Sequence, residues 1–381
     1  MSKKFDNCLE VSQDGLTDDF FASIPTQRGT VLFSDENDNP IQLLCVGSVR
    51  RAVKGRLLAE ADEKPTRKAD IKAITKKISY KISLCEFRAN LDCCEVAMSL
   101  FGKDYRDYFA FGKMWYLRID LSQKWPGFSI SSKPVAENDC DIKTFGPFVT
   151  RKSAADYQNA LEDAFGVCKR YNYLSDPEKA KSCPYLQMKL CCAICIGQTT
   201  PMQYRQRISN LLIAIENPSQ ARRKLTEQMN RFAENLEFEN AQRTKKQIES
   251  ISVLCKNDYR WIGSIDKLSV LHVDKSAKVK VKGQRKKQQG YTMFLVTAAG
   301  VKDFGDFVPD GIEKVFKKVA GYKEKQLLKC SAKKHTYYKN LEDVLRLTGF
   351  YLYRFKSPGI WLDELSSSTA ELVADYVRMA D

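Results

Sequence analysis

Apolar and polar residues alternate with a period of two in several short stretches of the chain, and this alternation predicts β-strands. The first two stretches are separated by the turn-forming segment 35–40, which is dense in Asp, Asn and Pro, so they predict a hairpin. A basic segment with helical spacing follows them. The strands expected from these patterns are 29–33, 41–46, 78–87, 115–121, 268–273, 277–281, 291–297 and 351–355.

Apolar residues spaced three and four apart predict helices between these strands. The segment 145–148 is expected to be a turn, and Ser153 with Asp156 then resembles a capping box at a helix start. In 219–253 the apolar face shifts near Asn235, which predicts a helical hairpin. The other expected helices are 94–105, 201–216, most of 311–347, and 370–379.

These patterns predict an α+β multidomain chain, since 381 residues suffice for two or three domains. We expect a small α/β domain over 20–135 and a Cys-rich helical middle domain over 145–217. The helical hairpin over 219–253 and a C-terminal α/β region over 258–381 complete the chain.

The formal net charge of +15 indicates a polyanionic partner, with nucleic acid as the first candidate and an anionic membrane surface as the second. The alternative is an ordinary solvated surface with surplus lysine. No apolar run reaches the ~18 residues that a membrane span requires, so we expect no membrane insertion. The candidate phosphate contacts are Arg50, Arg51, Lys54, Arg56, Lys278, Lys280, Lys282, Arg285, Lys286 and Lys287.

Cysteines are concentrated in one segment, as Cys168, Cys183, Cys191 and Cys195 with spacing Cys-x14-Cys-x7-Cys-x3-Cys. The N-terminal residues carry no secretory signal, so we expect a cytoplasmic protein with reduced thiols. Clustered thiols in that compartment indicate a metal centre, either an iron–sulfur cluster or zinc. The alternative is that they are small buried core residues. With two histidines in the chain, nucleophilic catalysis by Ser-His or Cys-His pairs has few possible bases.

The segment 145–251 resembles the middle of UvrC, the incision subunit of bacterial nucleotide excision repair. The resemblance rests on Gly146-Pro147-Phe148, on Cys168, and on the Cys-x7-Cys-x3-Cys group that closes at Gly197. In that family these four cysteines hold a four-iron four-sulfur cluster. The resemblance therefore implies a 4Fe-4S cofactor, with the adjacent Cys192 as a bystander.

The hairpin segment resembles the UVR motif, which in UvrC binds the matching element of UvrB. The match runs from Leu236-Glu237-Phe238-Glu239 to Ile248. It implies a UvrB-like partner for this chain. The residues expected to contact that partner are Leu236, Phe238, Ala241, Lys245 and Ile248.

The N-terminal region resembles a GIY-YIG nuclease domain. Gly29-Thr30-Val31 stands at the first family motif and Cys45-Val46-Gly47 at the second. The family uses tyrosines from both motifs, an arginine, and a glutamate that holds one divalent metal. Here Val31 and Cys45 replace the tyrosines, and Met98, or Leu100 if the alignment gap is shifted by two, replaces the glutamate.

Arg56 is thus the possible catalytic remnant, and we expect an inactive nuclease site, because these groups act as a unit. Mg²⁺ is needed only if the nuclease is active. Leu268 to Phe307 resembles the opening strands of the RNase H-like domain of UvrC, without its paired aspartates. Asp303 and Asp306 form the nearest pair.

The sequence therefore predicts a UvrC-like DNA-repair protein that binds DNA and a UvrB-type partner. One alternative is an active structure-specific endonuclease that makes a single metal-dependent incision, with Glu95 as a substitute metal ligand. The other is a metal-stabilised protein-interaction module without a role on DNA.

Overall fold

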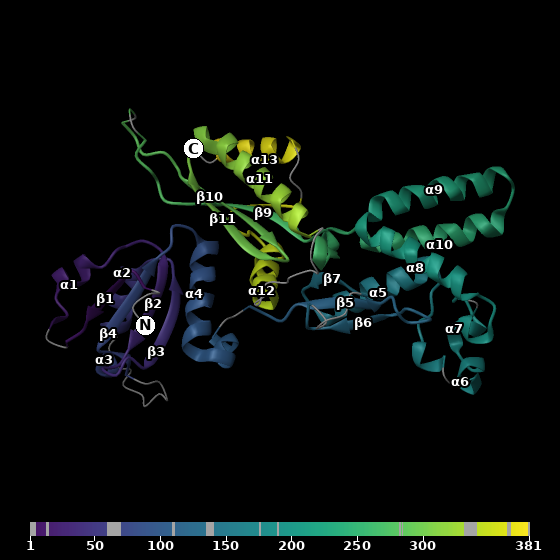
Figure 1. The fold of residues 1–381 in the computed structure, drawn as a ribbon, viewed down its shortest axis with the longest axis horizontal. Coiled ribbons are helices and arrows are strands. Elements are labelled where there is room, and N and C mark those ends of the chain that lie inside the picture. Colours follow the sequence, from purple (N-terminus) through teal and green to yellow (C-terminus); the bar gives the residue numbers. More distant parts are fainter. Residues whose placement is uncertain are drawn as a thin grey trace.

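A computed structural model describes residues 5–12, 15–58, 70–108, 111–134, 141–174, 177–188, 190–281, 283, 285–330, 341–363 and 367–379. Within these residues, thirteen α-helices accompany twelve strands in three four-stranded sheets, drawn in Figure 1. All strand pairs are antiparallel. The expected mixture of helices and strands is confirmed. In the part of the chain that the structure describes, no helix is long and apolar enough to cross a membrane.

The N-terminal sheet has the strand order β1-β4-β2-β3. Its strands are β1 (Asn7–Glu10), β2 (Gly29–Ser34), β3 (Pro40–Val46) and β4 (Lys77–Ile82). One face carries the hydrophobic core formed with α1 (Asp18–Ser23), α2 (Val49–Leu57) and the short α3 (Ile71–Ile74). The other face carries α4 (Glu86–Phe101), where the Thr30 hydroxyl donates to the carbonyl oxygen of Ala89 at 3.3 Å.

Helix α4 begins earlier than the sequence predicted. Residues up to Phe87 were expected to be a strand, and a helix was expected only from Cys94. In the structure β4 ends at Ile82, and α4 starts at Glu86 and ends at Phe101. The reason lies far away in the sequence, because the carboxylate of Asp274 accepts hydrogen bonds from the backbone N–H groups of Glu86 and Phe87. A 3-10 helix (Gly102–Tyr108) follows α4.

The middle sheet has the order β6-β5-β7-β8. Its strands are β5 (Trp115–Asp120), β6 (Phe128–Ser131), β7 (Ile142–Phe148) and β8 (Gly263–Ser264). The expected turn at 145–148 is wrong: these residues continue β7, because Phe145 pairs with Leu117 on one side and Ser264 on the other. Since β5 and β6 belong to this sheet, we place the first domain boundary between α4 and β5 rather than after residue 135.

Helices α5 (Arg151–Phe165) and α8 (Pro201–Glu216) pack on the middle sheet. The bounds of α8 match the expected helix. The capping box of α5 is formed by Thr150 and Ser153, three residues before the predicted pair, so Ser153 is its third helical residue and not its cap. Two short helices, α6 (Pro177–Lys181) and α7 (Pro184–Gln187), lie within the cysteine segment.

The predicted hairpin consists of α9 (Pro218–Glu234) and α10 (Phe238–Leu254), and it projects away from the sheets (Figure 1). Asn217 caps α9 by accepting the N–H of Gln220. Helix α10 is fixed to the middle domain, because Gln247 donates to the carbonyl oxygen of Ala164 at 2.8 Å and Ile251 is fully buried against Ala164. The base of the hairpin is thus anchored, while its far end extends into solvent.

The C-terminal sheet has the order β11-β10-β9-β12. Its strands are β9 (Ser269–Lys275), β10 (Tyr291–Thr297), β11 (Gly300–Phe307) and β12 (Ile360–Leu362). Helices α11 (Ile312–Cys330) and α13 (Ser367–Met379) cover one face, and α12 (Leu341–Leu352) covers the other. Both faces are buried, so the strands read as nearly continuous apolar runs.

Two expected C-terminal strands are absent from the described residues. In 277–281 the single pairing is an isolated bridge between Val279 and Gln288. In 351–355 the chain completes α12 at Leu352, and the late strand is β12 instead.

The side chain of Phe87 joins the N-terminal helix α4 to the C-terminal core. Its ring makes edge contacts with His272, Phe294 and Trp361 at centroid distances of 5.0, 5.1 and 5.4 Å. His272 in turn stacks on Trp361 at 3.8 Å. Figure 1 shows α4 between the N-terminal sheet and the C-terminal region. Helix α4 therefore packs on the N-terminal sheet and also contributes Phe87 to the C-terminal core.

Candidate functional site

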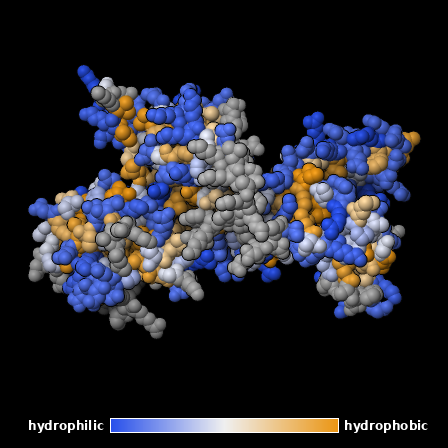
Figure 2. Space-filling view, viewed as in Figure 1, coloured by the Kyte–Doolittle hydropathy of each residue, from blue (hydrophilic) through white to orange (hydrophobic). Residues whose placement is uncertain are grey.

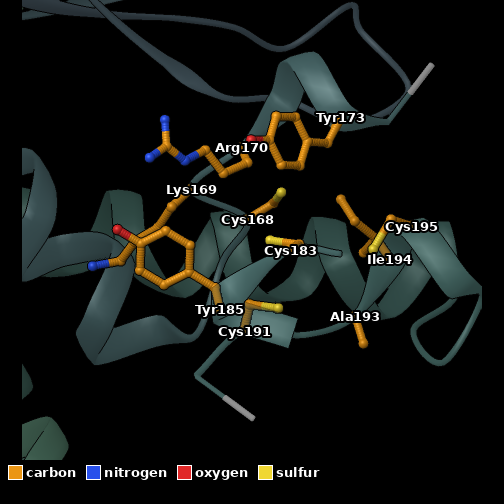
Figure 3. A pocket seen from close by; sticks show the side chains of 10 residues that line it. All are labelled: Cys168, Lys169, Arg170, Tyr173, Cys183, Tyr185, Cys191, Ala193, Ile194 and Cys195. Carbon is orange, nitrogen blue, oxygen red and sulfur yellow. The ribbon is translucent and has the colours of Figure 1, made fainter. Parts of the chain in front are cut away.

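The four clustered cysteines line a single pocket in the middle domain, shown in Figure 3. Cys168 follows α5, Cys183 precedes α7, and Cys195 lies in the 3-10 helix Ile194–Ile196. Cys191 lies between α7 and that 3-10 helix. All four line the same pocket, together with Lys169, Arg170, Tyr173 and Tyr185. The structure thus brings together the four residues that the spacing singled out.

Burial makes the Cys168 thiol a poor acid in the absence of a cation. Cys168 and Cys183 are 8 % and 6 % exposed, and burial raises the pKa of Cys168 to about 12. A bound metal would favour the thiolates, since ligands bind in their deprotonated form. Among the residues that the structure describes, no group of three or more His, Cys, Asp or Glu side chains is spaced as a formed metal site. The argument for a metal centre therefore rests on the type of ligand, because four thiols, which suit iron–sulfur clusters and zinc, line the same pocket.

Cys192 lies outside this pocket although it neighbours Cys191. It is 6 % exposed, and its carbonyl oxygen accepts a hydrogen bond from the Thr199 hydroxyl. It packs in the hydrophobic core of the middle domain. This placement sets Cys192 apart from the four cysteines that line the pocket.

A buried polar network lies beside the cysteines. Tyr171 and Tyr204 share a hydrogen bond of 2.8 Å, and Tyr204 donates to the carbonyl oxygen of Pro126. Glu162 on α5 is 2 % exposed, and burial raises its pKa from 4.5 to about 7, against the opposing effects of a hydrogen bond from Gln158 and the charge of Lys169. Sequence reasoning missed Glu162, because its helical position carries no motif.

The positions at which the nuclease resemblance expects catalytic residues lie apart in the structure. Val31 is fully buried in the core under α2 and pairs with Leu44. Cys45 pairs with Thr30, whose hydroxyl bonds to α4, so Cys45 lies on the opposite face of the sheet. Met98 is half-buried on α4, and Glu95 is exposed. Arg56 is exposed near the end of α2.

The basic residues of α2 divide into two groups. Arg50 donates from Nε to the Ile24 carbonyl and from Nη2 to the Ala22 carbonyl, both at 2.7 Å, so it holds the end of α1. Lys54 pairs with Asp18 at 3.4 Å. Arg51 and Arg56 are exposed. These last two are the α2 side chains best placed to reach an external phosphate.

The second predicted basic surface is the connection between β9 and β10, which extends beyond the sheet (Figure 1). Lys282 lies outside the described residues. The five described basic residues of the predicted set are exposed: Lys278, Lys280, Arg285, Lys286 and Lys287. We name this group the β9–β10 arm.

The predicted partner-binding residues lie along α10 and the turn before it. Leu236 and Phe238 are 72 % and 66 % exposed at the tip of the helical hairpin. Figure 2 shows hydrophobic colouring at this tip, while the rest of the hairpin is mainly hydrophilic. Lys245 is exposed, whereas Ala241 and Ile248 are half-buried. The Phe238 ring is thus not packed inside the hairpin and is open to a partner.

The two C-terminal aspartates make structural contacts. Asp303 pairs with Arg88 of α4 at 2.9 Å. Asp306 accepts hydrogen bonds from Ser276 and Thr292. His272 is fully buried, and His335 lies outside the described residues. Sequence reasoning missed Asp274, since its partners on α4 precede it by nearly half the chain.

Comparison with known protein families finds a match for the middle of this chain. Residues 114–214 match the family model described as UvrC/Cho excinuclease, middle domain. That span contains β5 to β7, α5, most of α8 and all four cysteines. Its start also agrees with a domain boundary before β5.

Several curated proteins are similar to the chain. UvrABC system protein C of Nautilia profundicola is 28 % identical over 269 residues, which are 68 % of this chain and 42 % of that protein. The protein of the same name from Campylobacter jejuni subsp. doylei is 31 % identical over 144 residues, 36 % of this chain and 22 % of that protein. For that of Chlamydia pneumoniae the identity is 24 % over 227 residues, 57 % of this chain and 36 % of that protein.

The chain thus spans less than half the length of these relatives. No solved structure gives a significant match. The family match over the cysteine segment and the similarity to UvrABC system protein C, taken with the pocket of four cysteines, lead to one conclusion: the chain is a UvrC-like protein, similar over residues 114–214 to the UvrC/Cho excinuclease middle domain.

Proposed function

We propose that this UvrC-like chain acts in nucleotide excision repair by binding DNA and a UvrB-type partner, without cutting the DNA itself. The observation that carries the proposal is the middle-domain match over residues 114–214. UvrABC system protein C is the name of the relatives, and the UvrC resemblance implies DNA and UvrB as partners.

The proposed DNA contacts are Arg51 and Arg56 on α2 and the β9–β10 arm. These side chains are exposed, and the chain carries a net charge of +15. Contacts between such cations and phosphates supply affinity without sequence preference, and they release counterions from the DNA. The proposed binding is therefore non-specific and sensitive to salt.

The proposed cofactor is a four-iron four-sulfur cluster held by Cys168, Cys183, Cys191 and Cys195. Their convergence on one pocket supports this assignment. When bound, the cluster would join four segments of the chain through metal–thiolate bonds. Zinc is the other metal that suits four thiolates, and iron content separates the two.

We propose that the chain does not cleave DNA because of the residues at the positions where the nuclease resemblance expects catalytic side chains. Val31 and Cys45 lie on opposite faces of the sheet, and neither can act as a tyrosine does. Met98 offers no carboxylate for a divalent metal. Loss of several groups that act together removes far more activity than loss of one.

A salt titration of DNA binding tests the proposed function. Fluorescence anisotropy with a damaged duplex is expected to show an association constant that falls linearly with salt on a log–log plot. The double variants Arg51→Ala/Arg56→Ala and Lys286→Ala/Lys287→Ala are expected to lower the slope by about one for each phosphate that the variant no longer neutralises.

The matched control is Arg378→Ala, which removes one positive charge from an exposed α13 side chain paired with Asp375. It is expected to leave the slope unchanged. Binding that is absent at low salt, or equal slopes in all variants, would contradict the proposed DNA role.

A further inference from the structure

A pocket of about 430 Å³ lies where the N-terminal domain meets the C-terminal helix α12. The N-terminal part of its wall includes Arg28, Cys45, Glu86 and Asn90, and the C-terminal part is Phe350 and Arg354. Its volume falls within the range of small-molecule sites. Two separate domains are therefore required to build it.

Two arginines and one carboxylate give the pocket its charge. Arg354 Nη1 lies 3.0 Å from Glu86 Oε1, and Arg28 Nη2 lies 3.6 Å from Glu86 Oε2. The Arg28 and Arg354 side chains are 34 % and 43 % exposed, so a ligand can reach both. The longer Arg28–Glu86 separation leaves guanidinium donors available to a phosphate, which suits the planar fork of arginine.

The C-terminal wall supplies flat surfaces for stacking. The Arg354 guanidinium lies over the Phe350 ring at 5.5 Å from its centroid, and the Phe111 ring meets Phe350 edge-on at 5.2 Å. Unstacked nucleic-acid bases stack on aromatic rings and on guanidinium planes. Cys45, on the opposite wall, stays uncharged at neutral pH, because burial raises its pKa to about 11.

We propose that this pocket receives one unstacked nucleotide of the bound DNA, with its base against Arg354 and Phe350 and its phosphate on Arg28. This inference rests on the proposed DNA binding. Extruding a nucleotide costs least where it is already unpaired or damaged. The pocket would thus favour DNA that carries such a nucleotide over intact duplex.

The experiment compares two duplexes of the same sequence, one fully paired and one with a single-nucleotide bulge, by fluorescence anisotropy with the full chain. Wild-type protein is expected to bind the bulged duplex about tenfold more tightly, the order of effect of stacking one base. Arg354→Gln is expected to reduce this preference to near one. Because that change also breaks the pair with Glu86, Cys45→Phe provides a second variant, which fills the pocket without changing its charge.

The matched control is Phe355→Ala, which removes an aromatic ring that is 87 % exposed, next to Arg354 but outside the pocket lining. It is expected to keep the preference for the bulge. Equal affinity of the wild type for both duplexes, with salt-dependent binding to each, would overturn this inference and leave the proposed function intact. A bulge preference that survives in both pocket variants would also overturn it. Absence of binding to either duplex would overturn the proposed function together with this inference.

Discussion

The carboxylate of Asp274 on β9 accepts the backbone N–H of Phe87 at 3.3 Å, and the same oxygen accepts the N–H of Glu86 at 3.1 Å. Cys85, the N-cap of α4, makes no side-chain capping bond. A residue of the C-terminal sheet therefore caps a helix of the N-terminal domain, where the helix dipole also favours a negative charge. This contact and the burial of the Phe87 ring bind the two regions together.

Replacing Asp274 tests this connection. Asp274→Ala leaves two first-turn N–H groups buried without an acceptor, which costs about 1–3 kcal/mol. Asp274→Asn keeps one side-chain oxygen acceptor and is expected to cost less. Hydrogen exchange followed by mass spectrometry is expected to show faster exchange in peptides covering α4 and β9 for the Ala variant. Unchanged exchange there, as expected for the exposed control Asp375→Ala, would show that Asp274 does not hold α4.

Glu162 makes the stability of the middle domain depend on pH. Its pKa is about 7 in the folded protein against 4.5 for the free group, so the folded state holds the proton more tightly. The free energy of unfolding therefore falls as pH rises from about 4.5 to about 7, by roughly 3 kcal/mol for the full shift.

Glu162→Gln cannot ionise and is expected to remove this slope. The readout is the hydrogen-exchange opening energy of α5 peptides at pH 5 and pH 7.5, corrected for intrinsic exchange rates. The wild type is expected to be less stable at the higher pH, and the variant about equally stable at both. If the opening energy of the wild-type α5 peptides were instead higher at pH 7.5 than at pH 5, this would contradict the raised pKa of Glu162.

The cysteine pocket makes a prediction about metal content. Protein purified without oxygen is expected to be brown, with about four iron atoms per chain. Cys183→Ser removes a pocket thiol and is expected to lose most of the iron, whereas Cys192→Ser removes a neighbouring core thiol and is expected to keep it. Iron counting and the visible absorption spectrum measure both. Colourless protein with stoichiometric zinc would reject the iron–sulfur assignment.

The hairpin tip predicts where a UvrB-type partner binds. Phe238 is 66 % exposed, and buried aromatic residues dominate the energetics of interfaces. Phe238→Ala is therefore expected to weaken association by tenfold or more, measured by calorimetry, with little effect on folding of the free chain. Lys246→Ala, an exposed change on the same helix, is the control and is expected to alter affinity less than threefold. Equal small effects would mean that the hairpin tip is not the contact.

Local patterns predicted the elements whose boundaries are set by their own residues. Pro201 and Glu216 bound α8 as expected, because Thr200 and Gln203 form a capping box at its start. The hairpin turned where its apolar face shifted. The four cysteines, too, could be selected by spacing, and they meet in one pocket.

Tertiary contacts decided the elements that the patterns missed. Phe145 lies in a turn-like sequence, yet pairing with Leu117 and Ser264 extends β7 through it. The early start of α4 depends on Asp274. The pocket between Arg28 and Arg354 joins residues from opposite ends of the chain. The residues around each of these positions do not indicate partners that are distant in the sequence. These features could therefore be recognised only from the three-dimensional structure.

The measurement that tests the central proposal most directly is an incision assay on an end-labelled damaged duplex, with a UvrB-type partner and Mg²⁺ or Mn²⁺, run beside a binding assay in the same buffer. We predict salt-dependent binding with no cleavage, because Val31, Cys45 and Met98 occupy the nuclease positions. Site-specific cleavage that disappears in Arg56→Ala or Glu95→Ala would contradict this prediction and would make the chain an active endonuclease.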